Sequence, residues 1–207
     1  MNSKHLLFSL TVALLSAGLF PSAAQAATIT IDSLIYQTNG DGTASVTDCT
    51  DSSGSVEIPS SITVDGTPYT VTSIGNRAFV DCSSLTNIII PDSVQTISEG
   101  SFAGCNSLTQ IFIPDSVLSI GNNAFFSCKS LKEIIIPNSV SSIGEYAFLY
   151  CKSLNKVYFQ SQKPPKMDDS TFSKCPSNMM IYYPAGAEPN WGPLWHEFST
   201  APWDPVK

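Results

Sequence analysis

A repeat of 23 residues constrains the fold of this chain more than any other feature of its sequence. Phenylalanine, cysteine, proline, valine and an isoleucine followed by glycine or serine each recur at this step. The phenylalanines are Phe79, Phe102, Phe125, Phe148 and Phe172, and the cysteines are Cys82, Cys105, Cys128, Cys151 and Cys175, with a last step of 24 residues in both series. Apolar positions kept in register over such a period are typical of a solenoid, in which successive coils stack and share one core.

Within one coil, the pattern predicts which side chains point inward. Leu85, Ile88 and Ile90 follow the spacing L-x-x-I-x-I, which places the last two on the same face of a strand. Pro91 then ends the strand, because proline lacks the N–H group that a ladder requires. Stacked coils would place phenylalanine on phenylalanine and cysteine on cysteine, so that each column buries apolar surface that one repeat alone cannot hide.

The segment before the repeats divides into two parts. Residues 1–26 have the layout of a secretory signal peptide, with Lys4, an apolar run from Leu6 to Phe20 and small residues before a cleavage site after Ala26. That run is shorter than the roughly 20 residues that a membrane-spanning helix needs. Residues 27–55 are predicted to form a β-hairpin cap, because two alternating stretches at 28–36 and 43–47 flank a turn sequence.

The repeats themselves occupy residues 56–184, which hold about five coils. The first coil is lengthened around Val64–Pro68, where a small hairpin is expected. The fourth coil has lost the proline of its neighbours. Residues 185–207 are rich in tryptophan and are predicted to cap the last coil, because the core exposed there must be covered.

The repeat C-x-S-L-x-x-I-x-I-P-x-S-V-x-x-I-G-x-x-A-F resembles that of the BspA-like leucine-rich-repeat proteins, a class of bacterial surface and secreted proteins. The resemblance covers roughly residues 56 to 186, with Ser98 in place of a glycine as one departure. It implies a β-rich α/β solenoid with one parallel sheet, here with a β-hairpin cap and a Trp-rich cap. It also implies a surface or secreted binding protein, since some members adhere to host or matrix proteins, and it carries over no catalytic residue.

The charge of the chain limits its partners. The formal net charge is −7, and 13% of the residues are charged. Nucleic acid or an anionic membrane would require a basic face, so neither is predicted as a partner. No second apolar run follows the first. The chain is therefore predicted to be exported without membrane insertion, and to be secreted or held at the cell surface, with the periplasm as another possible location.

The cysteines present three alternatives: disulfides, a metal site or free thiols. Neighbours in the column would lie roughly 5 Å apart, which permits a disulfide by distance. Stacked side chains leave the backbone in parallel directions, however, which makes the required torsion awkward. A column of buried free thiols is predicted, while a bridge from Cys49 to Cys82 stays open. The spacing lacks the close cysteine pairs of zinc sites, so no metal or other cofactor is predicted.

Enzymatic motifs are missing from the sequence. It contains no nucleophile elbow, no H-E-x-x-H and no phosphate-binding glycine loop, and the one histidine after residue 26 is His196. Glu57 and Glu133, which could be imagined as a pair that cleaves glycosides, fall three coils apart and in different columns. No catalytic residue is predicted.

One column of each predicted strand must face outward, between the two inward residues. Its members are Glu57, Ile89, Phe112, Ile135, Tyr158 and Tyr182, and a polar rim follows beside them at Asn87, Gln110, Glu133 and Lys156. An exposed apolar band with a polar rim is typical of a protein-binding patch. The alternative is that these side chains only stabilise the sheet through cross-strand pairs.

These observations predict a non-enzymatic exported protein that binds an extracellular or host protein through this band. Two other interpretations stay open. The band could pair two copies of the chain face to face, which would make it a structural or self-associating module. Alternatively, Trp191, Trp195 and Phe198 could stack on sugar rings, which would make it a glycan-binding protein.

Overall fold

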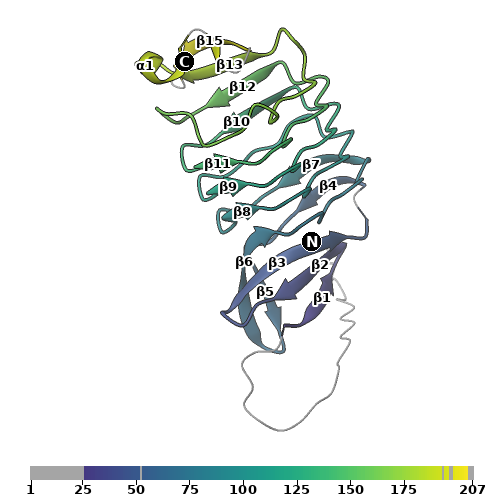
Figure 1. Cartoon of the computed structure of the whole chain (residues 1–207). Coiled ribbons are helices and arrows are strands. Elements are labelled where there is room, and N and C mark those ends of the chain that lie inside the picture. Colours follow the sequence, from purple (N-terminus) through teal and green to yellow (C-terminus); the bar gives the residue numbers. More distant parts are fainter. Residues whose placement is uncertain (1–25, 52, 193, 196–197, 205–207) are drawn as a thin grey trace, which may run out of the picture.

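The computed structural model describes residues 26–51, 53–192, 194–195 and 198–204. The chain forms a solenoid with its N-terminal strands at one end and its C-terminal strands at the other (Figure 1). The predicted signal peptide lies outside the described residues except for Ala26, and His196 lies outside them as well. Among the described residues, no helix is long and apolar enough to cross a membrane.

The N-terminal unit has three strands, β1 (Thr28–Ile31), β2 (Leu34–Thr38) and β3 (Thr43–Cys49), paired antiparallel in that order. The prediction of a single strand over residues 28–36 is wrong. Asp32 adopts a backbone φ of 52°, in the left-handed region that suits a tight turn, and this turn separates β1 from β2. The hairpin is thus a three-stranded unit, and its role as a cap stays a prediction.

The lengthened first coil forms the small hairpin expected around residues 64–68. It consists of β5 (Ser61–Val64) and β6 (Thr67–Ile74), which pair antiparallel. Asp65 and Gly66 both have positive φ, at 49° and 80°, as a two-residue type I′ turn requires. Because β6 also pairs parallel with β3, it joins the N-terminal unit to the solenoid.

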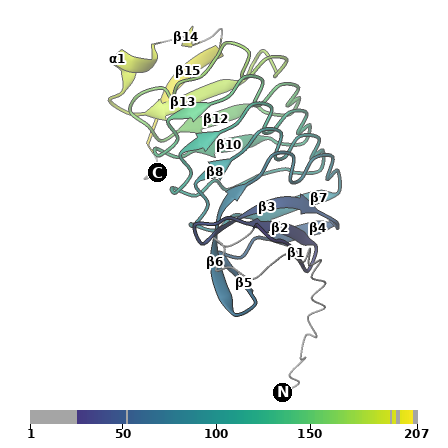
Figure 2. The ribbon, with the colours of Figure 1, turned by 60° about the horizontal axis from the view of Figure 1, so that its bottom comes forward.

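The strands with the L-x-x-I-x-I pattern form one column of parallel strands along the solenoid. Glu57 pairs with Ile89 in a two-stranded sheet, and a five-stranded sheet continues the column after a break (Figure 2). The strands of this column are β4 (Gly54–Glu57), β7 (Leu85–Ile89), β10 (Glu133–Ile136), β12 (Lys156–Phe159), β13 (Met180–Pro184) and β15 (Phe198–Trp203). The edge strand β14 (Leu194–Trp195) runs antiparallel to β15.

A second parallel sheet lies on the other side of each coil, so the prediction of one parallel sheet is wrong. Beyond β6 it is built from strands of two residues, which are β8 (Thr96–Ile97), β9 (Ser119–Ile120) and β11 (Ser142–Ile143). The glycines after Ile120 and Ile143 let neighbouring coils approach closely. A Cβ on Gly121 would lie only 2.7 Å from the carbonyl carbon of Ser98. Lys166 continues this sheet by a bridge to Ser142, although its coil lacks the proline.

The α/β label is not confirmed, because helix makes up almost none of the structure. Among the described residues, the α-helical part is α1 (Glu188–Trp191), a single turn of four residues. Turns connect the two extended segments of every coil. The phenylalanine at the start of each connection is followed three residues later by a cysteine whose N–H bonds to its carbonyl oxygen, as in Cys128 to Phe125 at 3.2 Å.

The core consists of the predicted side-chain columns. The phenylalanine rings stack with centroids 5.1 to 5.3 Å apart, close to the spacing between strands. Phe79, Phe102, Phe125 and Phe148 are fully buried, and so are Cys105, Cys128 and Cys151 beside them. The coil-by-coil stacking of phenylalanine on phenylalanine is therefore confirmed.

The C-terminal tail adds a further rung to the solenoid. Its strand β15 pairs parallel with β13, and Trp191 is buried with its ring centroid 4.8 Å from that of Phe159. Phe198 is buried too and meets Phe172 edge to face at 6.2 Å. Because Trp191 and Phe198 have little exposed surface, they cannot stack on a sugar ring. That the tail acts as a cap remains a prediction.

Candidate functional site

The outward residues of the L-x-x-I-x-I column form one row, which we call the apolar stripe: Ile89, Phe112, Ile135, Tyr158 and Tyr182. The strand registers place Ile135, Tyr158 and Tyr182 directly opposite one another. Because side chains alternate along a strand, Ile134 points into the core and is buried, whereas Ile135 is 40% exposed. Glu57, at the N-terminal end of the row, is exposed.

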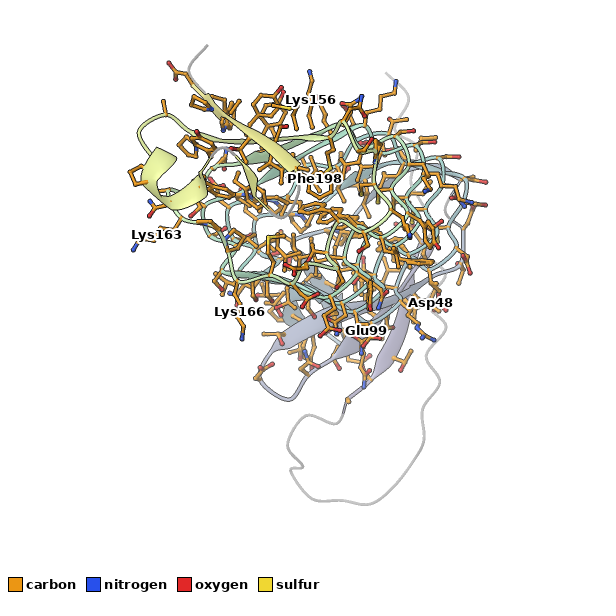
Figure 3. The ribbon with its side chains drawn as sticks, turned by 45° about the horizontal axis from the view of Figure 1, so that its top comes forward. Asp48, Glu99, Lys156, Lys163, Lys166 and Phe198 are labelled. Atoms are coloured by element: carbon orange, nitrogen blue, oxygen red, sulfur yellow. The ribbon has the colours of Figure 1, made fainter. Side chains whose placement is uncertain are left out.

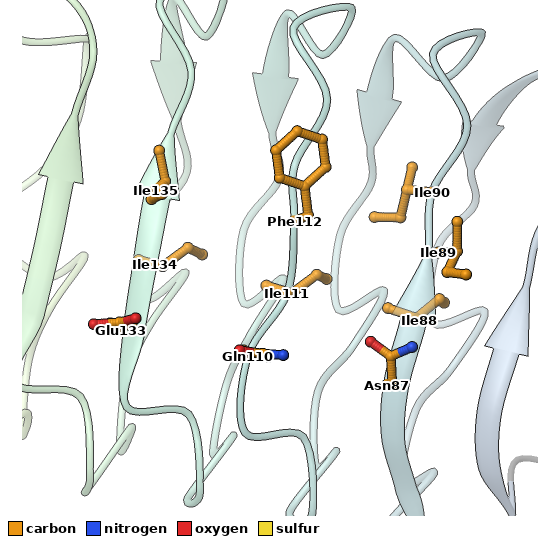
Figure 4. A pocket seen from close by; sticks show the side chains of 10 residues that line it. All are labelled: Asn87, Ile88, Ile89, Ile90, Gln110, Ile111, Phe112, Glu133, Ile134 and Ile135. Atoms are coloured by element: carbon orange, nitrogen blue, oxygen red, sulfur yellow. The ribbon is translucent and has the colours of Figure 1, made fainter. Parts of the chain in front are cut away.

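The exposed half of the stripe comprises Ile89, Phe112 and Ile135. Phe112 is 69% exposed and Ile89 is 50% exposed, which is unusual for large apolar side chains. Figure 4 shows the Phe112 ring standing out from its rung between Ile135 and Ile89, while Gln110 lines up with Asn87 and Glu133. A shallow pocket of about 330 Å³ lies across these three coils.

The backbone under Phe112 differs from that of its neighbours. Residues 108–113 form the rung between β7 and β10, yet they belong to no strand, and this rung is the break in the column. In this part of the described chain, no backbone hydrogen bond joins residues 110–113 to β7 or β10. The bond at the start of the rung runs from the Lys132 N–H to the Thr109 carbonyl oxygen at 3.2 Å. We call residues 110–113 the open rung.

The open rung has a chemical consequence for the pocket. Backbone N–H and C=O groups require a hydrogen-bond partner, and those without one in the protein bind water or a ligand. The pocket lined by Ile89, Phe112 and Ile135 therefore offers apolar side chains together with main-chain donors and acceptors. The open rung could not be predicted from the sequence, because Leu108, Ile111 and Ile113 follow the same pattern as the corresponding residues of neighbouring coils.

The aromatic half of the stripe is more covered than expected. The rings of Tyr158 and Tyr182 stack at 4.7 Å, and the Trp203 ring lies 4.9 Å from that of Tyr158. Trp203 is fixed there by a hydrogen bond from its Nε1–H to the carbonyl oxygen of Phe159, at 3.3 Å. Tyr158 and Tyr182 are consequently half-buried. Trp203 thus covers part of the stripe, a contact that the sequence did not predict.

The predicted rim runs beside the stripe. Gln110, Glu133 and Lys156 are exposed, and Asn87 is half-buried because its Nδ2 donates to Ser55 Oγ at 3.0 Å. Glu133 and Lys156 are direct neighbours in the register of β10 and β12. Figure 3 shows Lys156 on one side of the solenoid, with Lys166 and Glu99 toward the opposite side.

The sequence and structural comparisons agree with the repeat solenoid. A model of the BspA type leucine rich repeat region matches the chain in six copies, over residues 59–179. The chain belongs to the BspA-type leucine-rich-repeat family. It is similar to the crystal structure of a leucine-rich repeat protein from Bacteroides capillosus, with 36% identity and a TM-score of 0.60, covering 64% of this chain and 98% of that one.

A second similar structure is the leucine-rich repeat protein of T. pallidum, with 29% identity and a TM-score of 0.50, covering 61% of this chain and 68% of that one. No curated protein matches the sequence. The members of this family share leucine-rich repeats, which serve protein–protein recognition generally. The outward residues of this BspA-type protein are therefore the candidates for determining which partner it recognises.

Other exposed apolar residues of the BspA-type protein lie away from the stripe. Leu118, beside β9 on the second sheet, is 51% exposed, and Val80 and Tyr150 are about two-fifths exposed at the turns that follow the phenylalanines. Lys152 Nζ lies 5.1 Å from the centroid of the Tyr150 ring. These residues were not singled out from the sequence. The Tyr150 ring meets that of Phe126 edge to face at 6.0 Å, and Phe126 lines a pocket together with Val80.

The titratable groups do not converge on the stripe. Burial raises the pKa of the thiols of Cys105, Cys128 and Cys151, and these groups lie in the core. In the described part of the chain, no group of three or more histidine, cysteine, aspartate or glutamate side chains is arranged to hold a metal ion. What the stripe can do chemically is bury apolar surface and form hydrogen bonds.

Proposed function

We propose that this chain is a non-enzymatic, exported protein that recognises another protein through the apolar stripe. The observation that carries the proposal is the exposure of Phe112, at 69%, between two half-exposed isoleucines and beside a polar rim. When a partner covers a large apolar side chain in this position, the buried surface stabilises the complex by about 25 cal/mol per Å². Such residues are the usual anchors of protein interfaces.

The open rung supports a protein partner over a purely apolar one. Main-chain groups of residues 110–113 lie beside the Phe112 ring, so a partner that covers the ring also meets hydrogen-bond donors and acceptors. A peptide segment carries both kinds of group, and burying backbone groups without partners would be unfavourable. The rim residues Gln110 and Glu133 add side-chain partners at the edge of the same patch.

Export and adhesion rest on the sequence and the family resemblance. Residues 1–26 have the layout of a signal peptide, and the resemblance is to surface and secreted proteins. We therefore propose an extracellular or host protein as the partner, with the chain secreted or held at the cell surface. The absence of catalytic motifs from the sequence supports a binding role rather than an enzymatic one.

Self-association is a second candidate, favoured by the charges of the rim. Glu133 and Lys156 are exposed neighbours on adjacent strands. When two stripes pair around a twofold axis, every contact occurs twice, once in each direction, so a residue of one copy can meet a different residue of the other copy. Glu133 of one copy could then approach Lys156 of its partner, where the opposite charges attract.

The proposed function can be tested on a panel of purified extracellular matrix proteins. Binding to the immobilised chain is measured for the wild type, for Phe112→Asp and for Leu118→Asp. The last variant adds the same charge at a comparably exposed residue outside the stripe, which makes it a matched control. Loss of an interface anchor costs about 2 kcal/mol or more, so Phe112→Asp should weaken binding by roughly 30-fold while Leu118→Asp leaves it unchanged.

A partner that binds wild type and Phe112→Asp equally would contradict the proposal, provided that circular dichroism shows the variant folded. The same holds if Leu118→Asp weakens binding as much as Phe112→Asp does, because the contact would then lie elsewhere.

A further inference from the structure

The first cysteine of the core column differs from the others in what its thiol meets. Four thiols each donate to the carbonyl oxygen of a phenylalanine in the preceding coil, at 3.1 to 3.2 Å: Cys105 to Phe79, Cys128 to Phe102, Cys151 to Phe125 and Cys175 to Phe148. Cys82 begins the column, so no coil with a phenylalanine precedes it. The thiol of Cys49, at the end of β3, lies at this end of the column with Cys82 as its neighbouring thiol, and it donates to the Asp51 carbonyl oxygen at 3.4 Å.

Backbone contacts hold the two cysteines at this position. Five residues after Cys49, Gly54 pairs with Leu85, and its N–H donates to the Ser84 carbonyl oxygen at 3.2 Å. The Thr86 hydroxyl donates to the Gly54 carbonyl oxygen at 2.9 Å. These contacts hold the segment that follows Cys49 against the coil that begins at Cys82, and Cys49 packs against the same core as Cys82. A disulfide requires the two Cα atoms to lie about 4.4 to 6.8 Å apart.

Exposure also separates this pair from the rest of the column. Cys49 is half-buried and Cys82 is 8% exposed, whereas Cys105, Cys128 and Cys151 have no exposed surface. A small oxidant in solution can therefore reach Cys49 without unfolding the core. All six cysteines are free thiols in this structure.

We propose that Cys49 and Cys82 form a disulfide that fastens the N-terminal unit to the first coil. The oxidant is a low-molecular-mass disulfide such as glutathione disulfide. The Cys49 thiolate attacks one of its sulfur atoms and releases one glutathione thiolate, and the Cys82 thiolate then attacks Cys49 Sγ and releases the second. The two cysteines lose two protons and two electrons, and glutathione disulfide is reduced to two thiols.

This bond would join the end of β3 to the turn before β7, and neither cysteine belongs to the apolar stripe. It closes the loop between residues 49 and 82, which contains β4, β5 and β6. A crosslink of this kind restricts the unfolded chain, so the oxidised protein should resist unfolding more than the reduced one. The inference concerns the integrity of the N-terminal end and is independent of which partner the stripe binds.

The environment of Cys49 also predicts how fast the bond forms. Burial, followed by the neighbouring Cys82, raises the pKa of the Cys49 thiol to about 11. Only the thiolate attacks a disulfide, so at pH values below this pKa the rate of disulfide formation should increase about tenfold for each unit by which the pH is raised.

The test is a thiol count on the purified protein. The reduced protein is incubated with glutathione disulfide, denatured, alkylated without reduction and analysed by intact mass and peptide mapping. We expect two of the six cysteines to escape alkylation and a single crosslinked peptide pair that contains Cys49 and Cys82. The unfolding midpoint of the oxidised form should rise by about 5 to 10 °C.

Two variants make the result specific. Cys49→Ala should remove the crosslink and leave every remaining cysteine alkylated. Cys175→Ala, which alters the half-buried cysteine at the other end of the column, should keep the crosslink. Alkylation of all six cysteines in the wild type, a glutathione adduct that persists on Cys49, or a crosslink between other cysteines would overturn the proposal.

Discussion

Phe112 and Phe125 lie in the same coil, 13 positions apart, and serve opposite purposes. Phe125 is fully buried between Phe102 and Phe148, with ring centroids at 5.3 and 5.2 Å, whereas Phe112 is 69% exposed. One period generates both the inner column and the outer row. The inner column keeps the same residue in every coil, while the outer row runs from Glu57 through isoleucine and phenylalanine to tyrosine. Stability and recognition thus reside in separate columns of one repeat.

The largest expected effect on the inner columns comes from alkaline pH. Burial raises the pKa of the Cys105, Cys128 and Cys151 thiols above the ordinary value of 9.0. The folded state therefore holds these protons more tightly than the unfolded state. The contribution of these thiols to the free energy of unfolding is fully present below pH 9.0 and is lost as the pH rises above it. The loss is about 1.4 kcal/mol per pH unit for each thiol, or about 4 kcal/mol per pH unit for the three together.

Urea unfolding of the reduced protein on both sides of pH 9.0 measures this slope. Cys128→Ser supplies the control, because a hydroxyl can still donate to the Phe102 carbonyl oxygen but does not titrate in this range. The slope of this variant should be smaller by the contribution of one thiol, about one-fifth of the total, because the pKa values of Cys49 and Cys175 are raised as well. A free energy of unfolding that stays constant across this pH range would show that the thiols are not buried as the structure has them.

Phe125→Ala tests the inner column directly. The substitution removes a ring that is stacked on both sides and leaves a cavity in a core with little room to relax. We expect a loss of about 3 to 5 kcal/mol in the free energy of unfolding, measured by chemical denaturation. A loss below about 1 kcal/mol would mean that the phenylalanine column does not carry the stability assigned to it.

Phe112→Ala makes the same chemical change in the outer row. Because the ring is mostly exposed and fills no core space, the free energy of unfolding should change by no more than about 0.5 kcal/mol. The same denaturation experiment measures it. A loss comparable to that of Phe125→Ala would favour the interpretation that the stripe only stabilises the sheet.

The smallest expected effect is a difference in hydrogen exchange between two neighbouring rungs. Amides of the open rung, residues 110–113, lack the backbone bonds that join Glu133–Ile136 to β12. They should exchange faster than the amides of β10 when followed by mass spectrometry or NMR, since exposed groups exchange without local unfolding. Equal protection of both rungs would indicate that the column is continuous in solution.

Much of the fold follows from the sequence because its strongest signal is the spacing of buried residues. The phenylalanine and cysteine columns, the inward Leu85, Ile88 and Ile90, and the hairpin at residues 64–68 depend on local pattern and fixed period. The second sheet was missed because strands of two residues are too short to show a period of their own. The turn at Asp32 was missed although the alternation shifts by one position there, from Ile29 and Ile31 to Leu34 and Tyr36.

The candidate site could be predicted in position but not in detail. Alternation along each strand identified the outward residues, and the exposure of Ile89, Phe112 and Ile135 agrees with it. The open rung depends on how neighbouring coils are spaced, which the repeat pattern of residues 108–113 does not encode. The cover over Tyr158 comes from Trp203, 45 residues later in the chain, and no local pattern predicts a contact over that separation.

The molar mass of the purified protein, measured by light scattering across a micromolar concentration series, tests most directly whether the stripe is free to recognise another protein. We predict that wild type and Phe112→Asp are monomers at every concentration, because the exposed half of the stripe is left for a different partner. A dimer that Phe112→Asp dissociates and Leu118→Asp preserves would contradict this, since the stripe would then be occupied by a second copy of the same chain.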